Sequence, residues 1–313
     1  MGKSSHKSTE FLPLLQLIFR YMGYICGPQK RPKMDIFSQI GPLRAFLEQK
    51  KALGKSVGFV PTMGALHDGH LVLITESLHE NDITVCSIYV NPTQFNNAED
   101  LARYPRTIDQ DIEMLKSVRC DVLFCPSNEE IYPEKSIIRF DFGLLEHVLE
   151  GEFRPGHFSG VAKVVSKLLN IVQPERAYFG QKDFQQFKIV ACLVQELKFN
   201  VRLRCISIQR EKDGLAMSSR NLRLNNDHRK NAIAFYESLQ LAKRRLKEGV
   251  SMPSIREEIK KYCESKEGVR LEYIELADTS NFVLLESVTS NAILLIAGYV
   301  GEVRLIDNLV LNE

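Results

Sequence analysis

The sequence predicts an α/β domain built on a parallel sheet, followed by a smaller domain of mixed helices and strands. Short apolar runs rich in β-branched residues alternate with amphipathic stretches through most of the chain, which is typical of βαβ units. Several of these runs end in polar loops that contain Gly or Pro. After Asn225 the pattern changes to long charged helices and three apolar strands, which indicates a second, α+β domain.

The expected elements follow one another in a regular order. Helices are predicted over residues 40–51, 71–80, 107–118, 161–172, 228–247 and 254–263. Strands are predicted over residues 56–60, 83–90, 121–125, 177–179, 201–208, 271–277, 292–300 and 303–305. We expect the first domain to cover residues 34–208 and the second to cover residues 209–313, with a hinge near residues 209–213. No cluster of chemically active residues is expected after Asn225.

Composition and charge argue against several classes of protein. The chain has 313 residues, 44% of them hydrophobic, and a formal net charge of +2, so nothing suggests a nucleic-acid or membrane partner. Seven scattered cysteines without a CxxC pair argue against a disulfide framework or a zinc site. We therefore expect a cytoplasmic protein.

Residues 1–33 match no targeting signal well. The apolar run of residues 11–19 is too short to span a bilayer and is interrupted by Gln16. The opening MGKSSH has His6 where a myristoylation signal requires Ser or Thr. Because Met34 begins a stretch typical of an enzyme, we expect residues 1–33 to be a disordered or mis-assigned extension.

The segment PTMGALHDGH, from Pro61 to His70, is the richest in possible chemistry. It joins a predicted buried strand to a predicted helix, so it lies at the carboxyl edge of the sheet, where ligands bind. A helix N-terminus favours phosphate, and His67 and His70 can add hydrogen-bond donors there. Two histidines three residues apart could equally be half of a metal site or ordinary polar residues at a helix start.

Two further segments suit the same edge of the sheet. Gln94 follows the second predicted strand and can offer a donor and an acceptor to a hydroxyl-bearing ligand, although an isolated loop glutamine usually faces water. The segment GQKDFQQ, residues 180–186, has the order strand, glycine, lysine and helix that suits phosphate. Lys182 could supply a positive charge or be a solvated amine, Asp183 suits a ribose hydroxyl, and Gln186 could be a helix surface residue.

Two loops complete the candidate regions. The segment MSSR, from Met217 to Arg220, offers serine hydroxyls and an arginine fork, both of which can bind phosphate. Residues 149–160, LEGEFRPGHFSG, are expected to form a loop near the site. In that loop His157 either faces a ligand or is simply solvated.

These segments together resemble a known family. PTMGALHDGH is similar to the HxGH signature of the nucleotidylyltransferase superfamily, and MSSR is similar to its KMSKS-type loop. The order and spacing of PTMGALHDGH, NPTQF, GQKDFQQ and MSSRN resemble the pantoate–β-alanine ligase family, in which Gln181 is frequently Glu and Phe184 is frequently Tyr. The resemblance implies a doubly wound, Rossmann-like parallel sheet with a C-terminal α+β lid domain.

The resemblance also implies an activity. ATP and (R)-pantoate would form a pantoyl adenylate and pyrophosphate, with Mg²⁺ on the ATP phosphates and no metal ligand assigned in the protein. β-Alanine would then give pantothenate and AMP, in a cytoplasmic homodimer. The alternatives are another HxGH-superfamily nucleotidylyltransferase, which keeps the nucleotidyl product, and a nucleotide-binding protein without catalysis.

The resemblance further implies roles for individual residues. The catalytic residues would be His70 as the proton donor, His67, Lys182 and Arg220. Gln94 and Gln186 would bind pantoate and β-alanine, and the side chains of Met63 and Phe179 would suit the gem-dimethyl group of pantoate. The residues in contact with ATP would be Met63, Gly64, Ala65, Leu66, His67, Asp68, Gly69, His70, Gly180, Gln181, Lys182, Asp183, Gln209, Met217, Ser218, Ser219 and Arg220.

Overall fold

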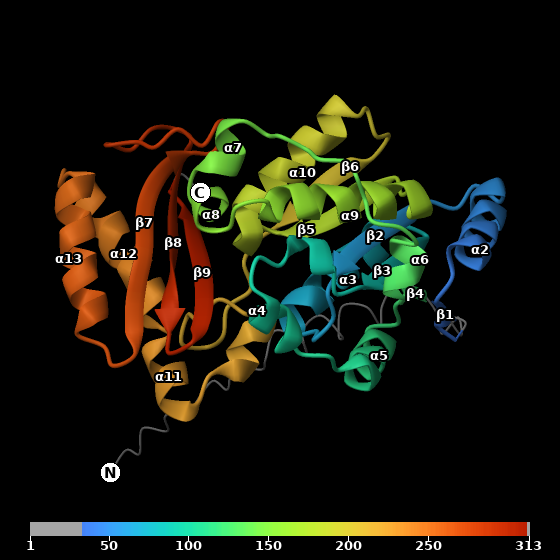
Figure 1. Cartoon of the computed structure of the whole chain (residues 1–313), viewed down its shortest axis with the longest axis horizontal. Helices are drawn as coiled ribbons and strands as arrows, with labels where there is room; N and C mark the ends of the chain where they lie inside the picture. Colours follow the sequence, from blue (N-terminus) through green and yellow to red (C-terminus); the bar gives the residue numbers. More distant parts are fainter. Residues whose placement is uncertain (1–32, 312–313) are drawn as a thin grey trace, which may run out of the picture. The chain divides into compact units, whose positions relative to one another are not determined.

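The computed structural model describes residues 33–311, so the expectation for residues 1–33 lies almost wholly outside the described part of the chain. Two sheets organise the described residues (Figure 1). The first has six parallel strands and the second has three antiparallel strands. The predicted fold class, an α/β domain followed by a smaller α+β domain, is therefore confirmed.

The six-stranded sheet reverses its direction of growth between two neighbouring strands, β2 and β5. The strand order is β1-β4-β3-β2-β5-β6. The strands are β1 Asp35–Phe37, β2 Val57–Thr62, β3 Ile83–Ile88, β4 Val122–Phe124, β5 Arg176–Gly180 and β6 Arg202–Ile206. After β2 the chain adds strands on one side, and β5 then pairs with the other side of β2. The carboxyl ends of β2 and β5 therefore form a topological switch point, the usual place for a ligand.

Helices pack on both faces of this sheet, as a doubly wound fold requires. On one face, α2 Ile40–Ala52, α9 His157–Val172 and α10 Phe184–Glu196 share an apolar cluster with the strands. On the other face, α3 Asp68–Glu80 and α5 Ile108–Ser117 contribute to a second cluster. The remaining short helices of the domain are η1 Pro92–Gln94, α4 Ala98–Ala102, α6 Asn128–Ile131, α7 Leu144–His147, α8 Glu150–Phe153 and η2 Gln181–Asp183. Another short helix, η3 Ser219–Arg223, comes after the expected domain boundary.

Several segments differ from the prediction, and the edge strand β1 was not predicted. Residues 149–160 are not one loop, because they contain α8 and the first turn of α9. Gly160 lies in the first turn of α9 and allows this turn to approach the main chain of Thr93, because a Cβ at position 160 would collide with that backbone. The helix predicted over residues 228–247 is divided into α11 Asn226–Asn231 and α12 Ala234–Lys247. Its apolar spacing continues across the turn between them, so periodicity alone could not detect the break.

The second domain is a three-stranded sheet covered on one face by helices. Its strands are β7 Val269–Asp278, β8 Ala292–Val300 and β9 Val303–Val310, in the order β7-β8-β9. Helices α12 and α13 Met252–Glu264 pack together against this sheet (Figure 1) and share its apolar cluster. Strand β9 is longer than predicted because its polar residues, Asp307 and Asn308, are buried. Among the described residues, no helix is long and apolar enough to cross a membrane.

Candidate active site

A cavity of about 210 Å³ lies at the carboxyl ends of β2 and β5. The predicted site residues that line it are Met63, His67, Gly69, His70, Gln94, Phe179, Gly180, Lys182, Asp183, Gln186, Gln209, Met217, Ser218, Ser219 and Arg220. The predicted site residues that do not line it are Gly64, Ala65, Leu66, Asp68 and Gln181. Four segments that are far apart in the sequence therefore meet at one place.

The loop between β2 and α3 is held in shape by a carboxylate from another helix. Gly64 and Ala65 both have positive φ angles, +76° and +48°. Because a residue with a Cβ, such as Ala65, rarely adopts such an angle, other contacts must hold the loop in this shape. Asp111 of α5 accepts hydrogen bonds from the backbone N–H of Ala65 (3.0 Å) and of Leu66 (2.8 Å). Its side chain also accepts a hydrogen bond from the Thr107 hydroxyl, and the residue is only 1% exposed. Asp111 thus fixes the turn that delivers the two histidines.

His67 and His70 lie at the first turn of α3, with ring centroids 4.0 Å apart. The backbone N–H of His67 donates to Nδ1 of His70 over 3.3 Å, so a neutral His70 ring carries its proton on Nε2. Burial lowers the pKa of His70 well below its usual value, and His67 and Lys182 lower it further. Burial and Lys182 likewise lower the pKa of His67 to about 4. Both rings are therefore neutral hydrogen-bonding groups near pH 7.

Gln94 is buried on one wall of the cavity and its amide is oriented by a neighbour. The side-chain amide of Asn91 donates to Oε1 of Gln94 over 3.0 Å and to the Gly160 carbonyl over 3.2 Å. His157 is buried as well, and its Nδ1 lies 2.8 Å from the Gln94 carbonyl oxygen. His157 is thus not solvated, because it is buried and its hydrogen bond joins α9 to the main chain at Gln94, and it also lines a small cavity with Arg154 and Lys182.

The loop that carries Lys182 is fixed from the second domain. The side-chain amide of Asn308, in a residue that is 1% exposed, donates to the carbonyl oxygens of Gln181 and Lys182, each over 2.9 Å. Beside it, Asp307 accepts two hydrogen bonds from the Arg210 guanidinium, at 2.6 and 2.9 Å. Asn308 and Asp307 position the loop and do not form a chemically active cluster of their own, so the expectation that no such cluster lies after Asn225 stays a prediction. Sequence reasoning did not identify these supports, because a buried strand residue has no sequence pattern that marks its partner.

The MSSR segment packs directly against the PTMGALHDGH loop. The Ser219 hydroxyl donates to the Ala65 carbonyl over 2.8 Å. Asp100 of α4 accepts hydrogen bonds from Arg220 (3.0 Å) and Arg223 (2.6 Å). This aspartate retains 27% of its side-chain exposure. Arg220 is thus poised at the cavity, but a phosphate that reached it would compete with the Asp100 carboxylate.

Chemically, the cavity combines hydrogen-bond donors suited to anions with two side-chain amides and an apolar wall. The helix N-terminus, the two neutral imidazoles, Lys182 and Arg220 all favour a phosphate. Within residues 33–311, no group of three or more His, Cys, Asp or Glu side chains could hold a metal ion. Asp111 and Asn308, which position these groups, were not predicted, because no local motif identifies them. Asn91 lies within the NPTQF segment, but no role was predicted for it.

Comparison with known proteins identifies the family. The family model described as "Pantoate-beta-alanine ligase" matches residues 35–310. The pantothenate synthetase of Aquifex aeolicus is 46% identical over 275 residues, which cover 87% of this chain and 97% of the relative. That of Bacteroides fragilis is 43% identical over 282 residues, which cover 90% of this chain and 100% of the relative.

Solved structures agree with this comparison. A crystal structure of the enzyme from Thermus thermophilus superposes with a TM-score of 0.84 at 39% identity, covering 90% of this chain and all of that one. The Francisella tularensis ligase, solved as a complex with "Beta-gamma ATP and Beta-alanine", superposes with a TM-score of 0.77 at 36% identity, covering 90% of this chain and 99% of that one. These similarities do not favour a different nucleotidylyltransferase. The chain belongs to the pantoate–β-alanine ligase family.

Proposed function

We propose that this chain condenses (R)-pantoate with β-alanine at the expense of ATP and that it does so through a pantoyl adenylate. In the first step a pantoate carboxylate oxygen attacks the α-phosphorus of ATP and displaces pyrophosphate. In the second step the β-alanine nitrogen attacks the acyl carbon, the bond to the AMP oxygen breaks with its electron pair, and the ammonium group loses two protons overall. The observation that carries this proposal is the meeting of all four motif segments in one cavity at the switch point.

The first step needs a site for phosphates, and one side of the cavity supplies it. We assign the ATP phosphates to the N-terminus of α3, Lys182 and the MSSR segment, because these groups offer N–H donors and positive charge. His70 would act through its Nε2–H on the charge that develops in the transition state. Its lowered pKa supports a neutral hydrogen-bond donor in place of a protonated acid, which refines the role expected from the resemblance.

The acid would lie on the opposite wall of the same cavity. Gln94 and Gln186 both line it and can pair with the hydroxyl and carboxylate groups of pantoate. The side chains of Met63 and Phe179 provide an apolar surface for the gem-dimethyl group. The nucleoside part of ATP would then contact Gly180, Asp183, Gln209 and Met217.

Magnesium would be held mainly by the substrate. The described residues offer no multi-carboxylate cluster, and Mg²⁺ commonly keeps several waters and binds through substrate phosphates. The protein groups beside those phosphates are donors and cations, which suits an ion carried in on ATP. When bound, Mg²⁺ would neutralise phosphate charge.

Further elements of the proposal concern organisation. We place the domain boundary between residues 208 and 209 and expect residues 209–313 to act as a lid over the site. We expect the protein to be a cytoplasmic homodimer. Sedimentation equilibrium of the purified chain tests the dimer. A change in small-angle scattering on addition of ATP and pantoate tests lid closure.

One assay tests the reaction itself. Purified protein is incubated with ATP, Mg²⁺ and pantoate, with or without β-alanine, and AMP, pyrophosphate and pantothenate are measured. We expect pyrophosphate and a tightly held adenylate without β-alanine, and stoichiometric AMP and pantothenate with it. Labelled pyrophosphate should exchange into ATP in a pantoate-dependent manner. A covalent acyl-enzyme in the intact mass, or exchange that requires β-alanine, would contradict the adenylate route.

A further inference from the structure

A second cavity, of about 460 Å³, adjoins the first and is rich in arginine. The two cavities share Lys182, Asp183, Ser218 and Arg220 in their linings. The other cationic residues that line the second cavity are Arg103, Arg154, Arg223, Arg270 and Arg304. The same lining contains the carboxylates of Glu99, Asp100, Glu150 and Glu302, so the cations able to bind an anion are those that these carboxylates leave without a close partner.

Most of these cations already have close partners. The closest pairings are Arg103 with Glu302 at 2.6 Å, Arg220 and Arg223 with Asp100 at 3.0 and 2.6 Å, Arg304 with Glu150 at 2.7 Å, and Arg270 over the Tyr299 ring at 4.2 Å. By contrast, Lys182 and Arg154 each approach a carboxylate only at 3.7 Å, beyond hydrogen-bond distance. Lys182 is assigned to the ATP phosphates, so Arg154 is the remaining cation of this cavity that has neither a close partner nor an assigned ligand.

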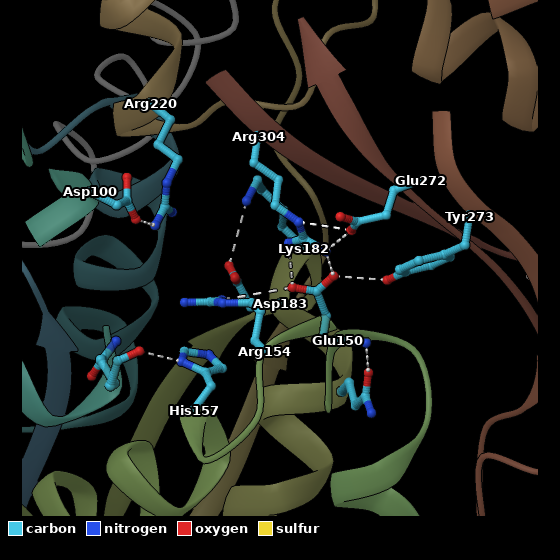
Figure 2. Close-up of polar contacts among 12 residues, drawn as sticks. Asp100, Glu150, Arg154, His157, Lys182, Asp183, Arg220, Glu272, Tyr273 and Arg304 are labelled. Atoms are coloured by element: carbon cyan, nitrogen blue, oxygen red, sulfur yellow. Dashed lines mark hydrogen bonds and ion pairs between the residues drawn. The ribbon is translucent and has the colours of Figure 1, made fainter. Parts of the chain in front are cut away.

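The carboxylate next to Arg154 is occupied by other donors. Glu150 accepts hydrogen bonds from Arg304 at 2.7 and 2.8 Å and from the Tyr273 hydroxyl at 2.9 Å (Figure 2). Arg154 is nevertheless largely enclosed, with only 20% of its side chain exposed. Burial lowers its pKa to about 10, even though Glu150 acts in the opposite direction. An enclosed guanidinium with its hydrogen-bonding capacity unused calls for an anionic ligand.

The position of Arg154 favours the acid end of the site over the nucleotide end. Its carbonyl oxygen accepts the backbone N–H of His157 over 3.0 Å, and His157 is in turn bonded to the Gln94 carbonyl. A small adjoining cavity is lined jointly by Arg154, Lys182 and Gln186. Arg154 is thus linked through His157 to the main chain at Gln94, and it shares a cavity lining with Gln186.

We propose that Arg154 binds the carboxylate of β-alanine and so directs its amine to the acyl carbon. This proposal rests on the adenylate route proposed above. The carboxylate takes no part in bond making, so a group that binds it is needed to distinguish β-alanine from a simple amine. A guanidinium fork suits that task because it pairs with both carboxylate oxygens. The competing anion for this cavity is the pyrophosphate released in the first step.

The test separates the two steps in Arg154→Gln, Arg154→Lys and the wild type. For Arg154→Gln we expect the KM for β-alanine to rise about 10- to 100-fold, the size of a lost charge-assisted hydrogen bond. Pantoate-dependent exchange of labelled pyrophosphate into ATP, measured without β-alanine, should stay within about twofold of the wild type. Arg154→Lys should fall between them, because it keeps the charge but loses the fork.

A specificity measurement distinguishes binding from a structural role. The ratio of kcat/KM for β-alanine to that for propylamine should fall about tenfold or more in Arg154→Gln, since propylamine has no carboxylate to lose. Arg103→Gln is the matched control, because it removes a cation from the same cavity that is 54% exposed and paired with Glu302. It should leave both the exchange and the acceptor ratio nearly unchanged.

Three results would overturn the assignment. The first is an unchanged KM for β-alanine in Arg154→Gln, and the second is an unchanged acceptor ratio. The third is a pyrophosphate exchange that is slowed as much as pantothenate formation, which would indicate that Arg154 binds pyrophosphate. Failure of the adenylate route itself is seen separately, because wild-type exchange would then be absent or would depend on β-alanine.

Discussion

Two aspartates hold two adjoining parts of the proposed phosphate site, and they do so in different ways. Asp111 is 1% exposed and accepts the backbone N–H groups of Ala65 and Leu66 in the loop before α3. Asp100 keeps 27% of its side-chain exposure and pairs with the guanidinium groups of Arg220 and Arg223.

The difference in burial and partners distinguishes a fixed wall, formed by the loop that Asp111 holds, from an exchangeable wall, formed by the arginines that Asp100 holds. A phosphate cannot replace Asp111, because that carboxylate is only 1% exposed and is already bonded to two backbone N–H groups and the Thr107 hydroxyl. A phosphate can replace Asp100, because Arg220 lines the cavity and can transfer its hydrogen bonds from one anion to another. We infer that the histidine wall is preorganised and that the arginine wall assembles with the nucleotide.

The largest expected effect comes from removal of the fixed support. Asp111→Ala leaves two buried N–H groups and the Thr107 hydroxyl without their acceptor, so the free energy of unfolding should fall by about 3–5 kcal/mol. Denaturant titration measures this loss. Asp109→Ala is the control, because Asp109 is exposed on the same helix. If both variants are equally stable, Asp111 does not fix the loop.

The next largest effect is expected at His70, which the fixed wall holds at the cavity. His70→Ala should cost about 2.7–4 kcal/mol of transition-state stabilisation, the size of one preorganised donor. ATP affinity should fall less, because the N-terminus of α3 still meets the phosphates. Single-turnover adenylate formation and calorimetry measure the two quantities. His79→Ala, on the exposed last turn of α3, is the control, and near-normal turnover by pure His70→Ala would exclude the role.

The acid pocket belongs to the fixed side of the comparison, since Asn91 orients Gln94 before any ligand binds. Gln94→Ala and Gln186→Ala should each weaken pantoate binding by about 1–3 kcal/mol, because a polar group of the acid is left unpaired. ATP binding should change much less. Titration calorimetry with pantoate and with ATP measures the two affinities of each variant. Gln195→Ala on the exposed side of α10 is the control. An equal loss of ATP affinity would move these residues out of the acid pocket.

The smallest effect is expected at the exchangeable wall. Asp100→Asn should change the free energy of unfolding by about 1 kcal/mol or less, because its ion pairs are partly solvated. It should lower the KM for ATP a few-fold, since Arg220 no longer has to leave a carboxylate. Steady-state kinetics at fixed pantoate measure the change. A clearly raised KM would show that Asp100 positions Arg220 and does not compete for it.

The same comparison explains what the sequence could predict. Strands, helices and the four motif segments carry local patterns, so the α/β fold and the meeting of the four segments in one cavity were predictable, although five predicted residues, Gly64, Ala65, Leu66, Asp68 and Gln181, do not line that cavity. Asp111 and Asn308 carry no such pattern, because each acts on backbone groups tens of residues away. The buried state of His157 was also hidden, since its partner is a main-chain carbonyl. Sequence patterns report surfaces and periodicity, whereas supports of this kind arise only from tertiary contacts.

The hydrogen bonds from Asn308 to the Gln181 and Lys182 carbonyls also have a consequence for synthesis of the chain. Asn308 follows Lys182 by 126 positions, so the ribosome must add that many residues before the support exists. At about 5–20 residues per second this takes roughly 6–25 seconds. During that interval the six-stranded sheet can already be complete while the lysine loop lacks its clamp. A nascent chain therefore gains its full nucleotide site late, once β9 has emerged and folded.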